Sequence, residues 1–352
     1  MEPALQPGVG PIRSATYLPS GVDSVLWGRL PCSTDSPVLR VDPGTEVTVD
    51  TISHEGILED QGRDPRKFFE SHGAGEVLSD AIELASSAYP RTFGVDGPHV
   101  VSRPVEVAGA RVGDLLAITV VETLPRVPYG VISNRHGKGA LPGEFPLSGE
   151  TFSAFARVEG GRGVLPLAPG SDRTVRFDLH PFLGIMGVAV AGDKRPHSVP
   201  PGPHGGNLDI SLLTVGSTLY LPIQVDGALA YVGDPHFAQG DGEVALTAME
   251  ASLRATVRLD VIAREDAATQ FGELAGPLAE TSQFLVPTGL DLDLDVATAN
   301  CVRAAIGLLQ ARFGMDPSMA LAYLSAATDF RISQVVDLVK GVHATIRKAD
   351  FE

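Results

Sequence analysis

The sequence predicts an α+β fold that is predominantly β, and three features of the chain indicate it. Its 352 residues include 39 glycines and 27 prolines, about 19% of the chain against an ordinary ~12%. Turn residues at that density favour many short strands and loops. Alternating apolar and polar residues recur through most of the chain, and Ala- and Leu-rich segments with helical spacing follow near its end. Because the strands come before the helices and do not alternate with them, an α+β class is expected.

Local patterns predict the individual elements. Residues 38–51 alternate around Asp42-Pro43-Gly44, which is typical of a hairpin. Residues 65–89 show the spacing of a single helix, and residues 125–143 contain so many helix and strand breakers that we expect a long loop.

Two helices are expected near the end of the chain, over residues 292–313 and 317–342. Asp316 is the predicted N-cap of the second helix, and Pro317 is its first residue. We divide the chain into residues 1–172, a β-rich part with one inserted helix, and residues 173–352, a β part followed by the helices. The two parts are expected to pack as one unit.

Composition excludes several classes of partner. The net charge is −16, the isoelectric point is about 4.9, and no segment gathers lysine or arginine, so neither nucleic acid nor an anionic membrane is an expected partner. Cys32 and Cys301 are too few for a disulfide framework. With no segment resembling a signal peptide or a membrane span, the expected location is the cytoplasm.

Residues of the types that bind metals are concentrated between positions 193 and 250. Asp234 and His236 are two residues apart, so on an extended segment both side chains leave the same face. Asp241 and Glu243 repeat this spacing. The usual sequence motifs of serine hydrolases, phosphate-binding loops and zinc proteases do not occur in the chain.

The segment from His204 to Asp209 adds an imidazole, two glycines and another carboxylate. Imidazole and carboxylate groups together are typical ligands of zinc or a similar divalent ion. A carboxylate that does not bind the metal could act as a general acid or base. Gly-Asp pairs also occur in simple turns, so these residues could have a purely structural role. Turns alone do not explain why so many acids and histidines occur within one segment. His54 and His136 are further candidates, although a strand end and a solvated loop would also accommodate them.

Two long motifs carry a resemblance to a known family. They are GPHGGNLD at residues 202–209 and GSTLYLPIQVDGALAYVGDPHFAQGDGEV at residues 216–244, and segments 97–116 and 320–346 agree with them. The chain resembles the acetamidase/formamidase family over most of its length.

The resemblance implies hydrolysis of short aliphatic amides, such as formamide and acetamide, to ammonia and a carboxylate. It also implies a jelly-roll-like β-sandwich elaborated with α/β parts, a cytoplasmic homo-oligomer (a dimer or higher), and a divalent metal ion. Zinc is the first choice of metal, with calcium or iron as alternatives.

Matching positions supply the expected site. Glu243 is expected to move the proton from water to the leaving nitrogen, and Asn207 or the amides of Gly205 and Gly206 to stabilise the oxyanion. The full set is Asp234, His236, His204 and Asp209 for the metal; Glu243, Asp241, Asn207 and His54 for catalysis; and Gly205, Gly206 and His136 for substrate binding.

One departure from the family pattern concerns Ser53-His54-Glu55, which stands where related chains place an aspartate after a similar strand. Either His54 or Glu55 takes over that role, or the chain acts on a different substrate. Two alternatives therefore stay open: hydrolysis of another amide-like compound such as a lactam, and a non-catalytic metal- or ligand-binding protein.

Overall fold

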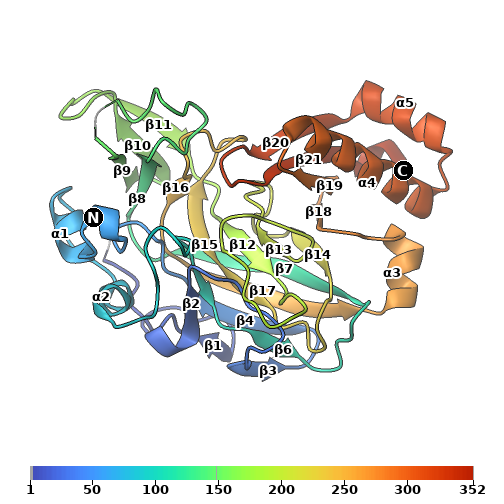
Figure 1. Ribbon diagram of the computed structural model, residues 1–352, viewed down its shortest axis with the longest axis horizontal. Coiled ribbons are helices and arrows are strands. Elements are labelled where there is room, and N and C mark those ends of the chain that lie inside the picture. The colour runs from blue at the N-terminus through green and yellow to red at the C-terminus, as the bar shows by residue number, and fades with distance from the viewer. Residues whose placement is uncertain (1–2, 148, 352) are drawn as a thin grey trace.

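The chain is described by a computed structural model that covers residues 3–147 and 149–351. Strands make up 36% of the chain and helices 18%, so the predominantly β, α+β class is confirmed. Two large sheets dominate, and Figure 1 shows the C-terminal helices gathered at one end of the molecule, away from the N-terminal helices.

The first large sheet contains strands from both predicted parts of the chain. β17 lies between β4 and β7, although its residues are distant from both in sequence. The division at residue 172 stays a prediction. In spatial order the strands are β1 (Thr16–Leu18), β4 (Thr45–Asp50), β17 (Leu253–Ile262), β7 (Leu115–Pro125), β14 (Thr218–Pro222), β18 (Leu278–Glu280), β19 (Phe284–Asp291), β21 (Lys340–Arg347) and β20 (Asp329–Gln334).

The second large sheet holds the residues of the central motifs. Two further strands, β2 (Val25–Trp27) and β5 (Val100–Ser102), pair at its side, and β3 (Leu39–Val41) and β6 (Val105–Val107) form a small separate pair. In spatial order the strands are β11 (Thr174–Asp178), β10 (Arg162–Pro166), β9 (Thr151–Glu159), β8 (Tyr129–Arg135), β16 (Met249–Glu250), β15 (Tyr231–Ala238), β12 (Phe182–Gly187) and β13 (Gly205–Asn207).

The main apolar core lies between these sheets. Ile118 and Val257 of the first sheet belong to the same buried cluster as Leu183, Met186 and Val232 of the second. Burying aliphatic side chains from both sheets removes apolar surface from water, at roughly 25 cal/mol per Å². This packing makes β12 and β15 rigid and buried on both faces, which gives the polar residues they carry fixed positions.

Five α-helices lie within the described ranges. The Asp316 cap is confirmed: its carboxylate accepts hydrogen bonds from the backbone N–H groups of Ser318 (2.9 Å) and Met319 (3.1 Å). Figure 1 shows α4 and α5 beside β19 to β21, where they cover that end of the first sheet. The helices are α1 (Pro65–Glu70), α2 (Ser79–Ser86), α3 (Arg264–Phe271), α4 (Leu294–Phe313) and α5 (Pro317–Ala327).

Two helix predictions need correction. The single helix expected over residues 65–89 is two short helices, because Gly73 takes a left-handed conformation (φ +76°) after α1. The last predicted helix, 317–342, ends at Ala327. The strands β20 and β21 follow it, because the alternating sequence after Thr328 is held by strand pairing in the first sheet.

Two predictions about the β part also need correction. The loop expected over residues 125–143 contains strand β8, where Tyr129 and Val131 are buried, since pairing with β9 and β16 holds this segment extended although it includes Gly130. Both strands expected around Asp42-Pro43-Gly44 form, but they do not make a hairpin ladder: β3 pairs with β6, and β4 pairs with β1 and β17. Within residues 3–147 and 149–351, no helix is long and apolar enough to cross a membrane.

Candidate functional site

Strand β15 places the central pair of the site. Asp234 and His236 are both buried, and Asp234 Oδ2 lies 3.1 Å from His236 Nε2. The two side chains leave the same face of the strand, as the spacing of two residues predicts. Asp234 has a φ of +51°, a backbone conformation that few residues other than glycine adopt and that is often found at functional sites.

Neighbouring segments bring three more carboxylates to this pair. Glu250 of β16 approaches His236 Nε2 with Oε1 at 3.1 Å, and Asp209, which follows β13, lies with Oδ1 3.9 Å from His236 Nδ1. Glu243 offers a carboxylate oxygen within 4.8 Å of ligand atoms of Asp209 and His236. Asp209 and Glu243, like Asp234, have positive φ values.

The N-terminal part of the chain contributes two histidines. His54, after β4, places Nδ1 3.6 Å from Asp234 Oδ1 and 3.8 Å from Glu250 Oε2. His99, just before β5, places Nε2 3.9 Å from the same Asp234 oxygen. The two imidazole rings meet edge to face with centroids 5.3 Å apart.

The C-terminal hairpin supplies the last acid. Asp337 lies between β20 and β21, and this hairpin is held to the Glu243 loop by two hydrogen bonds, Gly242 N–H to Ser333 O (3.0 Å) and Val335 N–H to Gly242 O (3.2 Å). Asp337 is buried and lines the same cavity as Glu243. We call these residues the acid cluster: Asp209, Asp234, Glu243, Glu250 and Asp337, with His54, His99 and His236.

Gly184 of β12 forms the floor of the acid cluster. A Cβ atom at this position would lie 2.5 Å from Asp209 Oδ1 and 2.7 Å from Asp234 Oδ2 and from His236 Cε1. Any side chain here would therefore displace three of the central groups, so the convergence of these residues requires a glycine.

The electrostatics of the acid cluster are unbalanced, because five carboxylates face three imidazoles. Burial and nearby carboxylates raise the pKa values of Asp209 and Glu243 well above their usual range, and they raise that of Asp337 to about 8. Burial lowers the pKa of His236, but Glu250 and Asp234 outweigh it and hold that pKa well above its usual value. The cluster thus has more acid than its histidines can neutralise.

Several buried atoms of the acid cluster make no hydrogen bond within the described residues. Both carboxylate oxygens of Asp209 are in this state, as are Asp234 Oδ1 and Glu250 Oε2. A buried carboxylate without a partner costs several kcal/mol. Carboxylate oxygens and imidazole nitrogens converging at this distance are a donor set that suits a divalent cation, so the residues present fit a metal ion.

A second, fully bonded carboxylate lies behind His54. Glu55 accepts hydrogen bonds from Ser133 Oγ (2.7 Å), Arg135 and Gln61, and its Oε1 lies 3.3 Å from His54 Nε2. Burial raises the pKa of Glu55, but Arg135 and His54 outweigh it and lower that pKa to about 2. Burial lowers the pKa of His54, but Glu250, Asp234 and Glu55 raise it to about 10.

A family model described as the Acetamidase/Formamidase family matches residues 189–348, which include β13, β15, β16 and the C-terminal hairpin. The resemblance to this family is confirmed.

Relatives and solved structures agree with the acetamidase/formamidase match. A formamidase of Methylophilus methylotrophus is 28% identical over 305 residues, 68% of this chain and 74% of that protein. An acetamidase of Mycolicibacterium smegmatis is 28% identical over 199 residues, 42% of this chain and 49% of its own length. These names agree with the predicted enzyme class, an amidohydrolase that acts on linear amides.

The acetamidase crystal structure from Bacillus halodurans superposes with a TM-score of 0.74 at 24% identity, covering 96% of this chain and 98% of that one. A gamma lactamase from Delftia acidovorans shares the fold more distantly, with a TM-score of 0.57 at 22% identity over 95% and 93% of the two chains.

Most of the predicted site residues of this acetamidase/formamidase-like chain come together. Asp209, Asp234, His236, Glu243 and His54 belong to the acid cluster. Asn207 and His136 line the same cavity, with His136 at its exposed side, where Nε2 lies 3.0 Å from Asp60 Oδ2.

Four predicted residues lie outside both the acid cluster and the cavity beside it. Asp241 is exposed, accepts a hydrogen bond from Ser211 Oγ (3.1 Å) and pairs with Arg331 (3.4 Å). His204 is buried beside Gly206, shares no ligand group with the cluster, and burial lowers its pKa to about 4. The Gly205 N–H already donates to Gly202 O (3.0 Å), and Gly206 pairs with Met186 of β12. Their functional roles stay predictions.

Sequence reasoning missed three members of the acid cluster. Glu250 had a detectable signal, a charged residue in a strand pattern that is otherwise apolar or small. Asp337 had none, because its neighbours in sequence carry no other ligand-type residue, and His99 has only Asp96 nearby, which is not part of the cluster. The tertiary fold alone brings both residues to the acid cluster.

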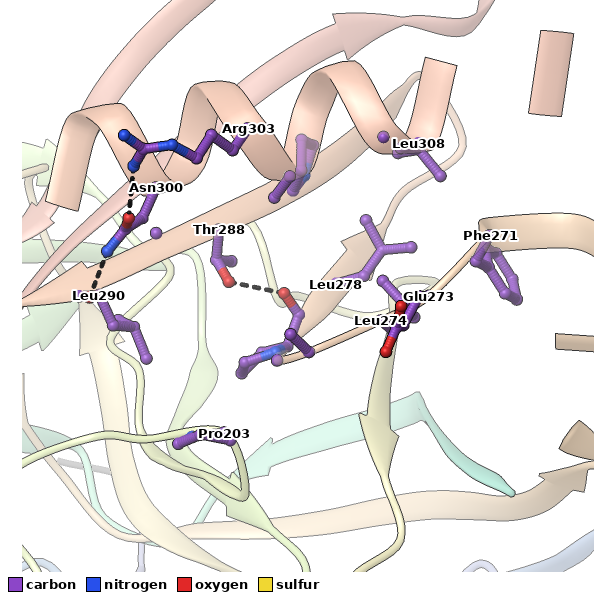
Figure 2. A pocket seen from close by; sticks show the side chains of 17 residues that line it. Pro203, Phe271, Glu273, Leu274, Leu278, Thr288, Leu290, Asn300, Arg303 and Leu308 are labelled. Atoms are coloured by element: carbon purple, nitrogen blue, oxygen red, sulfur yellow. Dashed lines mark hydrogen bonds between the residues drawn. The ribbon is translucent and has the colours of Figure 1, made fainter. Parts of the chain in front are cut away.

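The candidate site is one of several cavities in the described part of the chain. The acid cluster opens into one of about 390 Å³. A larger one, about 550 Å³, lies between α3, β19 and α4 and is shown in Figure 2. Two pairs of its polar groups bond to one another: Arg303 donates to Asn300 Oδ1 (2.8 Å), and Thr288 Oγ1 donates to Pro277 O (2.6 Å). Because titratable groups with perturbed pKa values line the smaller cavity, it is the candidate active site.

Proposed function

We propose that this chain hydrolyses short carboxamides, such as formamide and acetamide, to ammonia and the carboxylate at the acid cluster. The observation that carries the proposal is Asp209, whose two buried oxygens have no hydrogen-bond partner in the described chain and face further carboxylates. Together with the family match, this arrangement supports a metal-dependent amidohydrolase.

Asp209, Asp234 and His236 are the residues proposed to hold the metal, because His236 shares one group of converging ligand atoms with Asp209 and Glu243 and another with Asp234 and Glu250. A divalent ion there supplies positive charge that offsets the buried carboxylates and polarises a carbonyl or acidifies water. Zinc is the proposed ion, and the proposal includes the cytoplasmic location and homo-oligomeric assembly that the family resemblance implies. Metal analysis by mass spectrometry and sedimentation velocity test the ion and the assembly.

Glu243 is the proposed proton carrier. A new C–O bond forms between water and the carbonyl carbon, the C–N bond breaks, and the proton taken from water must reach the leaving nitrogen. Burial and the carboxylates of Asp337 and Glu250 hold the pKa of Glu243 well above its usual range, which favours the protonated form of the carboxyl group and so suits a group that takes up a proton from water.

His54 is proposed to stabilise the negative charge that develops on the substrate oxygen. Its Nε2 contacts the bonded Glu55 carboxylate, which fixes the orientation of the ring so that the imidazole can donate a hydrogen bond to the substrate oxygen. Asn207 lines the same cavity and supplies a second polar group toward the substrate.

The decisive experiment measures ammonia release from formamide, acetamide and propionamide, with the metal content of each preparation determined in parallel. Glu243→Gln is expected to lower kcat by about 10² to 10⁴ while the metal stays bound. Glu70→Gln, an exposed glutamate on α1, is the matched control and should behave as wild type.

Near-normal turnover by metal-loaded Glu243→Gln would remove Glu243 from its proposed role. If metal-loaded wild type releases no ammonia from any of the three amides, the proposed reaction itself is wrong. If removing the metal with a chelator leaves turnover unchanged, the metal dependence is wrong.

A further inference from the structure

The cavity above the acid cluster is much larger than the simplest amides. Formamide has three non-hydrogen atoms and acetamide has four. If each atom takes about the 30 Å³ that one water occupies in the liquid, acetamide needs on the order of 100 Å³. The cavity of about 390 Å³ is within the range of pockets that enclose considerably larger ligands.

Two large apolar side chains stand exposed at the mouth of this cavity. Phe93 is 51% exposed and Leu338 is 66% exposed, and both line the cavity although they are distant in sequence. The Phe93 ring meets the His136 ring edge to face, with centroids 6.5 Å apart, so the mouth has an aromatic wall. We call Phe93 and Leu338 the apolar lip.

The backbone at Leu338 is strained in a way that supports a function for its side chain. Leu338 has a φ of +66° and is the central residue of a three-residue turn closed by a hydrogen bond from Val339 N–H to Asp337 O (2.7 Å). A γ-turn with positive φ is rare and strained. Here the turn places Asp337 in the acid cluster and the side chain of Leu338 at the lip. Because consecutive Cα atoms are about 3.8 Å apart, the lip lies close to the acid cluster.

The charged groups around the lip are mostly occupied. Arg91 contacts Glu59 (2.5 Å) and Asp96 contacts Arg29 (2.6 Å). Lys138 has no ion pair among the described residues, so a positively charged ligand group is disfavoured there. What the mouth offers a substrate is therefore mainly apolar surface.

Resting on the proposed function, we infer that the preferred substrates are neutral primary amides whose acyl group carries a branched or aryl-bearing apolar substituent. That substituent lies against Phe93 and Leu338 while the carboxamide reaches the acid cluster. Recognition of an apolar substituent requires exposed apolar surface beside the polar site, and the apolar lip supplies it.

The test compares kcat/KM for acetamide, isobutyramide and phenylacetamide in the metal-loaded full chain. We expect wild type to favour phenylacetamide over acetamide by at least tenfold. Phe93→Ser and Leu338→Asn should each lower the ratio of the two kcat/KM values by about tenfold, because they remove the apolar contact. Asparagine is chosen because it tolerates positive φ.

Leu167→Asn is the matched control, since Leu167 is 53% exposed and lies outside this cavity. It should leave the ratio unchanged. The inference is overturned if wild type hydrolyses acetamide as well as phenylacetamide, or if both lip variants lose activity on the two amides equally.

A binding measurement separates this inference from the proposed function. If no amide is hydrolysed, the proposed reaction fails. Calorimetric binding of phenylacetamide that is weakened about tenfold by Leu338→Asn, and unchanged by Leu167→Asn, would still support the apolar lip. Absence of binding that depends on either lip residue would overturn it.

Discussion

Two of the groups of buried charges in the described chain differ in the cations that face their carboxylates. In the first, which we call the arginine cluster, Asp50 accepts hydrogen bonds from Arg254 Nε (2.6 Å) and Nη2 (3.0 Å), and Asp80 accepts one from Arg126 Nη1 (2.8 Å). Its two aspartates and two arginines balance in charge. The acid cluster has five carboxylates with only histidines as cations.

The difference teaches how to distinguish a structural charge group from a functional one. The arginine cluster ties the N-terminal segment to the first sheet, since Arg254 also donates to the carbonyls of Gln6, Val9 and Pro11, and its carboxylates are satisfied by the chain itself. Several buried oxygens of the acid cluster have no hydrogen-bond partner among the described residues. A bound group that is not part of these residues must therefore supply their partners.

The largest expected effect comes from breaking the arginine cluster. Asp50→Asn removes the charge that faces the fully buried Arg254, so the free energy of unfolding should fall by about 3–5 kcal/mol. Urea unfolding followed by circular dichroism measures this. Asp260→Asn, in a half-exposed pair with Arg258, is the control and should cost at most about 1 kcal/mol. Equal costs for the two variants would contradict the comparison.

Acid should destabilise the fold through histidines that lie outside any group of acids. Burial lowers the pKa of His343 to about 4, with Asp241 opposing this effect and Arg331 adding to it. The unfolded chain takes up this proton near pH 6.5, so the stabilisation is complete above that pH and is lost as the pH falls toward 4. The difference corresponds to about 3 kcal/mol.

His343→Gln tests this pH dependence. Between pH 7 and pH 4.5, the free energy of unfolding of the variant should fall less than that of wild type, because glutamine does not titrate. The Ser333 hydroxyl that contacts His343 at 2.8 Å can bond to the glutamine amide instead. Parallel pH profiles for the two proteins would show that His343 is not responsible.

The smallest expected change in stability is in the acid cluster. In metal-free protein, Asp209→Asn removes one of several crowded carboxylates, so the free energy of unfolding should stay within about 1 kcal/mol of wild type, on the stabilising side. The same variant should lose metal on dialysis. A metal-free variant that unfolds as readily as Asp50→Asn would show that the two clusters do not differ as described.

The sequence predicts the site residues that lie close together in the chain better than those that only the tertiary fold brings together. Asp234 and His236 were predicted to share a face because two-residue spacing on a strand is a local property, and they do. Glu250, His99 and Asp337 reach them through strand pairing and a distant hairpin, and no spacing rule links residues so far apart. Asp241 and Glu243 are also two residues apart, but Asp241 faces solvent because the glycine between them has a positive φ.

The fold shows the same limit. The predominantly β class follows from turn density and alternation, and the α5 cap follows from Asp316 and Pro317. The β20–β21 hairpin was not predicted, because the Ala- and Leu-rich segment just before it has helical spacing. Only pairing of β21 with β19 in the first sheet decides that the residues of the hairpin form strands.

The wide spacing of the site along the chain has a consequence for its assembly during synthesis. His54 and Asp337, on opposite sides of the acid cluster, are separated by roughly 280 residues. A ribosome adding about 5–20 residues per second needs on the order of 14 to 56 seconds to make that stretch. Throughout that interval the chain lacks Asp337 and the hairpin that carries it, so the acid cluster can be completed only after nearly all of the chain described here has been made.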